Sequence, residues 1–313
     1  IHRDETRYET SIGGIGPRAT PTIRGNRVFT AGSTGRLNCL DLTTGSLIWQ
    51  RDFVAENGAK IMDWGNAGSP LLLGEKVIIN AGGRDNKSLV AYHAETGEAL
   101  WSSGSNSAGY SSPSLHRIAG VNQVLIFNSG AVNAHHPTTG EILWSTPWER
   151  SESVAQPLPL PGDRVFVSSG YGVGCKLYEI VNDGQNLSAN MLWETPRLKA
   201  KFTNVVYHQG FIYGLDDGVF VCLDPETGDR KWKRGRYGHG QVLLVGSKLI
   251  VQTEGGEIVL LDPNPDRHVE LARIPALASK TWNNPTLAGS LLLVRNNREA
   301  VCFEVGLESA APL

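Results

Sequence analysis

The chain has 313 residues, of which 40% are hydrophobic and 19% are charged, and its formal net charge is −2. This near-neutral charge provides no general electrostatic attraction for nucleic acid or an anionic membrane surface. No apolar run reaches the roughly 18–20 residues that a membrane-spanning helix requires. The 36 glycines, against only 2 methionines, favour many short strands joined by tight turns, because glycine supplies the positive φ angles that such turns need.

The first predicted repeat begins with two short apolar runs and continues into a β-hairpin. The runs are ATPTI (19–23) and RVFTAG (27–32), and the hairpin is LNCLDLTTGSLIW (37–49). Glycine accepts the left-handed conformation of the turn, and Asp41 stands where a short carboxylate accepts hydrogen bonds from turn amides. The same hairpin pattern recurs without a gap three more times: LVAYHAETGEALW (89–101), VNAHHPTTGEILW (132–144) and FVCLDPETGDRKW (220–232).

Two short apolar runs also precede the next two hairpins, so that each repeat contains four strands. They are SPLLL (69–73) and KVIINAG (76–82) in the second repeat, and SPSL (112–115) and QVLIFNSG (123–130) in the third. Four strands per unit without helical periodicity, at intervals of roughly 40–50 residues, are typical of a β-propeller blade. The predicted fold class is therefore all-β, a β-propeller of four-stranded antiparallel blades.

Three further units are less regular. One spans about 154–195, with its hairpin expanded around 182–184, and another spans about 240–272, where GGEIVLLDPNPD replaces the Thr-Gly turn. The last unit, 282–304, supplies three strands and no fourth, which would leave an unpaired edge. Residues 5–10 are compatible with an extended strand, and we predict that they close this blade to give seven blades in the chain.

The first residues of the chain suggest an alternative blade number for the precursor. The segment IHRD (1–4) resembles WQRD (49–52), the end of a blade. A lost preceding repeat would make the intact protein eight-bladed. For this chain we expect one propeller domain over residues 1–313, with blades at approximately 17–51, 67–103, 110–146, 154–195, 202–234, 239–272 and 282–305.

The repeat pattern x-x-x-D-x-x-T-G-x-x-x-W resembles the pyrroloquinoline quinone (PQQ) repeat, which quinoprotein alcohol dehydrogenases share with the outer-membrane assembly scaffold BamB. The resemblance covers nearly the whole chain, from about Gly16 to Val305. The blocks GPRATPTI, SSGYGVGC, YGLDDGVFVCLD and GRYGHGQ are similar to a bacterial group of PQQ-binding-like β-propellers. The resemblance implies a periplasmic or secreted protein, and it is specific for fold rather than for function.

The tryptophan that ends each repeat has a structural interpretation. A side chain at the same outer-strand position in successive repeats buries the same kind of surface in every blade. We therefore expect docking residues that pack between neighbouring blades, rather than a cofactor site: Trp49, Trp101, Trp144, Trp193 and Trp232.

Propellers bind ligands at the mouth of the central channel, where loops lead into the innermost strands. Aligning the repeats at these positions gives the candidate ligand-binding residues: Arg18, Tyr110, Lys201, Asn204, Arg236, His239, Gln241, Trp282 and Asn284. Arg18, Lys201 and Arg236 would surround an anionic or carbonyl-rich ligand, because arginine makes bidentate contacts with such groups. Tyr110 and Trp282 would provide stacking faces.

Two interpretations of these residues stay open. In the functional one, His239 is an acid or base candidate, since its ordinary pKa lies near neutrality, and Lys199, Tyr171 and Trp64 lie on nearby loops. In the structural one, the polar candidate residues, which form a ring around the channel mouth, hydrogen-bond to backbone groups and to ordered water in the channel.

The resemblance to quinoprotein dehydrogenases of this repeat type implies two features for a PQQ site. These are a disulfide between adjacent cysteines and a calcium ion held by Glu, Asn and Asp. The four cysteines here, Cys39, Cys175, Cys222 and Cys302, include no adjacent pair, and no segment has the DxDxDG calcium pattern. No cofactor or metal ligand is assigned, and PQQ with Ca²⁺ stays the alternative. Cys39, Cys222 and Cys302 occupy matching strand positions in different blades, so we expect buried core residues and no disulfides.

The expected function is a non-catalytic, extracytoplasmic binding or scaffold propeller, with a ligand or peptide site at the channel mouth. No GxSxG, HExxH or P-loop pattern occurs, so no catalytic residue is assigned. The alternative is a PQQ-type quinoprotein dehydrogenase that oxidises alcohols or sugars. The expected partner is a protein, a peptide or a small anionic ligand. A third interpretation is that a partner strand adds to the edge of the incomplete last blade.

Overall fold

The computed structural model describes residue 3 and residues 18–148 and 152–306. These residues form 27 β-strands and no helix. The fold is a seven-bladed β-propeller, as the sequence predicts, and its described strands make six antiparallel sheets of four strands and one of three. The chain divides into two compact units, Ile1–Glu194 and Thr195–Leu313. The expectation of one domain over residues 1–313 stays a prediction.

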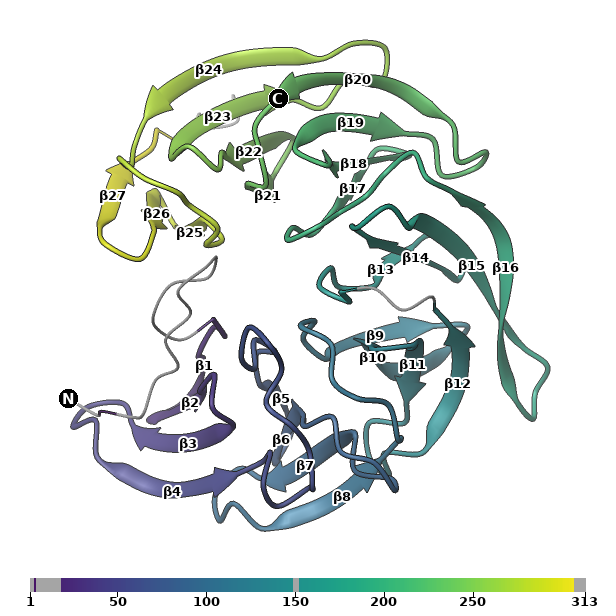
Figure 1. Ribbon diagram of the computed structural model, residues 1–313, viewed down its shortest axis with the longest axis vertical. Helices are drawn as coiled ribbons and strands as arrows, with labels where there is room; N and C mark the ends of the chain where they lie inside the picture. The colour runs from purple at the N-terminus through teal and green to yellow at the C-terminus, as the bar shows by residue number, and fades with distance from the viewer. Residues whose placement is uncertain (1–2, 4–17, 149–151, 307–313) are drawn as a thin grey trace, which may run out of the picture. The chain divides into compact units, whose positions relative to one another are not determined.

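The first unit contains four sheets, each built from four strands that are consecutive in the chain. Figure 1 shows these sheets following one another in an arc, with the first strand of each sheet on the inner side. The strands are β1 (Thr22–Arg24), β2 (Arg27–Ala31), β3 (Arg36–Asp41), β4 (Leu47–Asp52), β5 (Leu71–Leu73), β6 (Lys76–Asn80), β7 (Leu89–His93), β8 (Ala99–Ser103), β9 (Ser114–Ile118), β10 (Val121–Asn128), β11 (Ala131–His135), β12 (Ile142–Pro147), β13 (Leu158–Leu160), β14 (Arg164–Ser169), β15 (Gly174–Asn182) and β16 (Leu187–Thr195).

The second unit contains two four-stranded sheets and a three-stranded one, again with consecutive strands paired. In Figure 1 the first strands of these sheets lie on the inner side of the unit. The strands are β17 (Val206–His208), β18 (Phe211–Asp216), β19 (Val219–Leu223), β20 (Arg230–Arg236), β21 (Gln241–Val245), β22 (Lys248–Gln252), β23 (Glu257–Asp262), β24 (Val269–Pro275), β25 (Thr286–Ala288), β26 (Leu291–Arg295) and β27 (Ala300–Glu304).

The Thr-Gly turns form as the sequence predicts. In the first repeat Oδ1 of Asp41 accepts the backbone N–H of Thr44 at 2.8 Å and that of Thr43 at 3.0 Å, and Gly45 has a φ of 73°. The hydrogen bonds from Thr44 are the main reason why the pKa of Asp41 lies below its usual value, because they stabilise the charged carboxylate. In the second repeat Nδ1 of His93 takes the place of the carboxylate and accepts two turn N–H groups at 3.3 and 3.4 Å.

The hydrophobic core lies between the faces of neighbouring sheets. In the first unit Phe29 and Leu37 of the first sheet pack in one cluster with Val77 and Tyr92 of the second, and none of the four side chains is more than 1% exposed. Each blade therefore depends on its neighbour to bury its apolar face. An equivalent cluster joins the fifth and sixth sheets: Tyr213, Leu215, Phe220, Leu249, Val251 and Val259.

Two of the repeated tryptophans donate hydrogen bonds to the next sheet. The indole N–H of Trp49 on β4 reaches the carbonyl oxygen of Ala94 at 2.9 Å. The indole of Trp232 on β20 makes the equivalent bond to the carbonyl of Asn264, also at 2.9 Å. Both rings pack against the core cluster that the two sheets share.

The other three tryptophans lie at the same strand position with different contacts. Trp101 packs against Gly140 of the third sheet, where an added Cβ would lie 2.7 Å from Cδ2 of the ring. Trp144 is buried in the cluster shared by the third and fourth sheets. The ring of Trp193 lies 6.1 Å from that of Phe166 in its own sheet.

The last sheet ends at β27, and the residues predicted to complete it, 5–10, lie outside the described residues. Cys39 and Cys222 are buried as expected, but Cys302 on β27 is exposed, so the expectation of a buried residue there is wrong. In the first and fifth sheets a fourth strand flanks the strand that carries the cysteine. Among the described residues β27 is the outer strand of its sheet.

Candidate functional site

Hydrogen bonds connect the loops that lead into the first strands of the first unit. The backbone N–H of Thr20 donates to Oγ of Ser69, and the N–H of Ser69 donates to Oγ of Ser112, both at 2.9 Å. The three residues hold equivalent positions in three consecutive sheets. Each serine side chain therefore satisfies a backbone group of the preceding sheet, which agrees with the structural interpretation of this ring.

Gln241 plays a similar part in the second unit with its longer side chain. It is only 3% exposed at the start of β21. Its Nε2 donates to the carbonyl oxygens of Phe202 at 2.8 Å and Trp282 at 3.1 Å. Phe202 precedes β17 and Trp282 precedes β25, so one buried amide ties together the loops of three consecutive sheets.

The loops joined by Gln241 carry an aromatic cluster. The ring centroid of Phe202 lies 5.0 Å from that of Trp282 and 5.4 Å from that of His239. Two cations flank these rings: Nζ of Lys201 lies 5.3 Å from the centroid of Phe202, and Nζ of Lys280 lies 4.6 Å from that of Trp282. We call Phe202, His239 and Trp282 the Phe202 cluster.

Glu254 anchors the Phe202 cluster, and it was not among the residues selected from the sequence. Its Oε1 accepts the indole N–H of Trp282 at 2.9 Å, and its Oε2 accepts the backbone N–H of His239 at 3.0 Å. Burial alone would raise the pKa of Glu254, but these hydrogen bonds and the nearby charges of His239 and Lys280 outweigh it and lower the pKa. In the sequence this residue sits in a Thr-Glu-Gly-Gly segment, which indicates only a turn.

The structure thus brings together four of the residues predicted from the sequence, directly or through Phe202: Lys201, His239, Gln241 and Trp282. Three others of the second unit lie outside these contacts. Arg236 is an exposed residue at the end of the outer strand β20, and Asn284 is also exposed. Asn204 is half-buried, and its carbonyl accepts the hydroxyl of Thr203 at 3.0 Å. Arg18 lies half-buried before β1 in the first unit.

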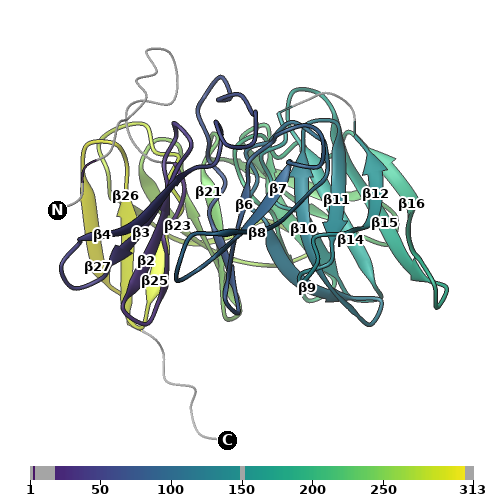
Figure 2. The same ribbon diagram turned by 90° about the horizontal axis from the view of Figure 1, so that it is seen from below.

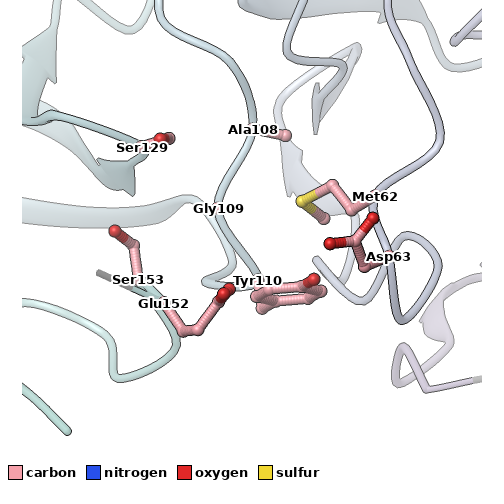
Figure 3. A pocket seen from close by; sticks show the side chains of 8 residues that line it. All are labelled: Met62, Asp63, Ala108, Gly109, Tyr110, Ser129, Glu152 and Ser153. Atoms are coloured by element: carbon pink, nitrogen blue, oxygen red, sulfur yellow. The ribbon is translucent and has the colours of Figure 1, made fainter. Parts of the chain in front are cut away.

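Tyr110, the remaining predicted residue, lines a pocket of about 420 Å³ in the first unit (Figure 3). The pocket is built from the β4–β5, β8–β9 and β10–β11 connections and the segment before β13. Figure 2 shows the β4–β5 connection, in dark blue, rising beyond the ends of the strands. The other lining residues are Met62, Asp63, Ala108, Gly109, Ser129, Glu152 and Ser153.

The charge of this pocket is opposite to the one expected for an anionic ligand. Its ionisable side chains apart from Tyr110 are the carboxylates of Asp63 and Glu152. Burial raises the pKa of Glu152, and the negative charge of Asp63 raises it further. The sequence offered little signal for these two residues, because they lie between the predicted strands and in no recognised motif.

Within the described ranges, no group of three or more His, Cys, Asp or Glu side chains is placed to hold a metal ion. In the same part of the chain, no helix has the length and apolar character needed to cross a bilayer. The alternative of PQQ with Ca²⁺ stays a prediction from the sequence.

The family of this protein follows from a match over most of its length. The family model described as outer membrane protein assembly factor BamB matches residues 6–234. The chain belongs to this family. The resemblance found in the repeats is thereby confirmed. No curated protein sequence matches the chain significantly.

Solved structures with the same architecture include a member of the family. BamB from Moraxella catarrhalis has a TM-score of 0.65 and 16% sequence identity, over 92% of this chain and 82% of that chain. The computationally designed Ika8 protein has a TM-score of 0.51 and 13% identity, over 91% of this chain and 95% of that one. A europium-containing methanol dehydrogenase has a TM-score of 0.45 and 13% identity, over 88% and 72% of the two chains. At these identities the first two similarities show the fold alone, and nothing is concluded from the third, whose TM-score is below 0.5.

Proposed function

We propose that this protein is a non-catalytic scaffold that binds a polypeptide partner in outer membrane protein assembly. The observation that carries the proposal is the match of residues 6–234 to the BamB family, whose description names an assembly factor. Membership of this family also supports a location outside the cytoplasm. The proposal assigns no catalytic residue and no cofactor.

We place the partner site at the Phe202 cluster. Aromatic side chains are among the groups that contribute most to protein–protein binding. Here Glu254 accepts the indole N–H of Trp282 and the backbone N–H of His239, and Gln241 donates to the backbone carbonyls of Phe202 and Trp282. Ordered rings lose little conformational entropy on binding. The aromatic rings of the Phe202 cluster, together with the positive charges of Lys201 and Lys280 beside them, fit an acidic or carbonyl-rich segment of a partner.

Binding of peptides to charge-reversal variants tests this proposal. Fluorescence anisotropy would be measured with labelled peptides of about ten residues, the length of a transmembrane β-strand, taken from an outer-membrane β-barrel protein. We expect saturable binding that is weakened about tenfold in Lys280→Glu, since one short-range charge contact changes sign. Lys87→Glu is the matched control, because Lys87 is also exposed but belongs to the first unit. Equal affinities of the two variants, or no binding by the parent protein, would contradict the site.

Calorimetric titration of the metal-free protein with PQQ, with and without Ca²⁺, tests the alternative. We expect no heat of binding and no thermal stabilisation. Saturable one-to-one binding that disappears in Trp282→Ala would support a quinoprotein dehydrogenase instead. An assay of alcohol oxidation would then follow.

A further inference from the structure

The pocket lined by Tyr110 in the first unit has a fixed backbone. The N–H groups of Tyr110 and Ser111 both donate to the carbonyl of Ser153, at 2.7 and 3.2 Å, and the hydroxyl of Ser153 donates to the carbonyl of Asn128 at 3.0 Å. The backbone at Gly109 packs closely against Ser153 and leaves no room for a side chain, since an added Cβ would lie 2.8 Å from Cβ of Ser153. The pocket wall is therefore already ordered before any ligand arrives, which favours binding.

Two carboxylates face this pocket, and the described residues that line it include no cationic side chain. In Figure 3 the ring of Tyr110 lies between the side chains of Glu152 and Asp63. Neither carboxylate has an ion pair or hydrogen bond with another described side chain, and Asp63 is the charge that acts on Glu152. Two like charges that share a partly buried space repel each other, so a positive group between them would be stabilised by both.

An aromatic surface adjoins the two carboxylates. The ring of Trp64 lies 5.3 Å from that of Tyr110, and the ring of Tyr171 stacks on Trp64 with centroids 6.4 Å apart. The backbone N–H of Trp64 also lies 3.4 Å from the hydroxyl of Tyr110. Aromatic faces attract cations through their quadrupole, and they pack against the alkyl chain that carries such a cation.

We propose that this pocket binds an alkylammonium or guanidinium group, with the positive charge at Asp63 and Glu152 and the alkyl part against Tyr110. A volume of about 420 Å³ accommodates a lysine or arginine side chain or a small free amine. A polypeptide side chain and a free amine would bind through the same contacts, a positive charge at the carboxylates and an alkyl part at the ring. This inference rests on the charges and rings of the first unit and does not depend on the function proposed above.

The experiment follows the indole N–H resonance of Trp64 by NMR, assigned through its loss in Trp64→Phe. The probes are acetyl-Gly-Lys-Gly-amide, its neutral counterpart acetyl-Gly-Gln-Gly-amide, and butylamine. We expect the lysine peptide to shift this resonance saturably and the glutamine peptide to leave it unchanged. A shift by butylamine of equal affinity indicates a site for free amines, whereas a shift by the peptide alone indicates a polypeptide ligand. Equal responses to the lysine and glutamine peptides, or no response to any probe, overturn the proposal.

Charge-neutralising variants complete the test. Glu152→Gln and Asp63→Asn should each weaken binding of the lysine peptide about tenfold, because each removes one short-range charge contact. Glu98→Gln, an exposed residue beside the outer strand β8, is the matched control and should bind as the parent protein does. Thermal unfolding of each variant verifies that the fold is intact. Unchanged affinity in both pocket variants overturns the proposal.

Discussion

The indole N–H of Trp282 donates a hydrogen bond to Oε1 of Glu254 over 2.9 Å, across 28 residues of sequence. The second carboxylate oxygen holds the backbone N–H of His239. One glutamate therefore orients both the ring and the loop that sequence alignment had placed at the candidate site. The position of Trp282 is thus determined by a residue of the neighbouring sheet.

Replacement of Glu254 by alanine should destabilise the protein. Two N–H groups lose a charged acceptor, and each such hydrogen bond is worth about 1.5–3 kcal/mol, so we expect the free energy of unfolding at neutral pH to fall by at least about 1.5 kcal/mol. The pKa of Glu254 is lowered in the folded protein. Its contribution is therefore present above the pKa of the unfolded chain and is lost as the pH falls through the folded value.

Urea unfolding of Glu254→Ala at neutral and acidic pH checks this expectation. The difference from the parent protein should shrink on acidification. Glu98→Ala, at an exposed position, should change stability by no more than about 0.5 kcal/mol. A pH-independent difference would show that packing rather than charge is responsible.

Asp216 should be sensitive to loss of its charge. Its side chain is 1% exposed, and its oxygens lie 2.5 Å from Nζ of Lys199, 2.5 Å from Nζ of Lys233 and 3.3 Å from Nη1 of Arg230. Asp216→Asn leaves three cations together, and breaking a buried ion pair in this way costs about 3–5 kcal/mol. The partial exposure of the cations places the expected loss near the lower end.

Asp217→Asn provides the control for that measurement. Asp217 is 45% exposed and lies 3.6 Å from the same Lys199. Its φ of 46° is a conformation that asparagine tolerates. Denaturant unfolding should show a change below about 1 kcal/mol, as for exposed ion pairs. Equal losses in the two variants would mean that burial of Asp216 does not matter.

A pair of glycine variants isolates the contact between Trp101 and the next sheet. Gly120 and Gly140 have φ values of 77° and 78°, so alanine costs about 1–2 kcal/mol of backbone strain at either position. Around Gly120 nothing lies within 4 Å of an added Cβ, whereas at Gly140 it meets the ring of Trp101. Gly140→Ala should therefore lose about a further 1–3 kcal/mol through overpacking. Equal melting temperatures of the two variants would refute a tight contact.

Glu152→Gln should act in the opposite direction to Glu254→Ala. Burial and the charge of Asp63 raise the pKa of Glu152 in the folded protein, so stability falls as the pH rises from the pKa of the unfolded chain to that of the folded protein. The variant should be more stable than the parent at neutral pH, by less than about 1 kcal/mol for this partly exposed group. The two proteins should converge below the pKa of the unfolded chain. Denaturant unfolding of both proteins over this pH range tests the prediction. A Glu152→Gln variant that is less stable than the parent at neutral pH would show that ionisation of Glu152 does not destabilise the fold.

The local part of the fold could be predicted from the sequence because its causes are local. The turn at Asp41 and Gly45 depends on residues within four positions of each other, and the repeated tryptophan lies at a constant distance from that turn. Repetition then made the blade pattern visible, and it placed His239 and Trp282 at equivalent positions of adjacent repeats, with Gln241 two residues after His239. These positions are close in the structure because consecutive blades repeat the same path.

The chemical character of the two candidate sites was decided only by the tertiary structure. Glu254 reaches Trp282, and Glu152 acts with Asp63 across almost ninety positions of chain, through loops that have no repeat pattern. The exposure of Cys302 was also not predicted from its matching strand position; among the described residues β27 is the outer strand of its sheet. The strands follow from short apolar runs and turn residues that recur in each repeat. The side chains that meet at the candidate sites depend instead on the path of each irregular loop. That path is determined by packing between distant segments.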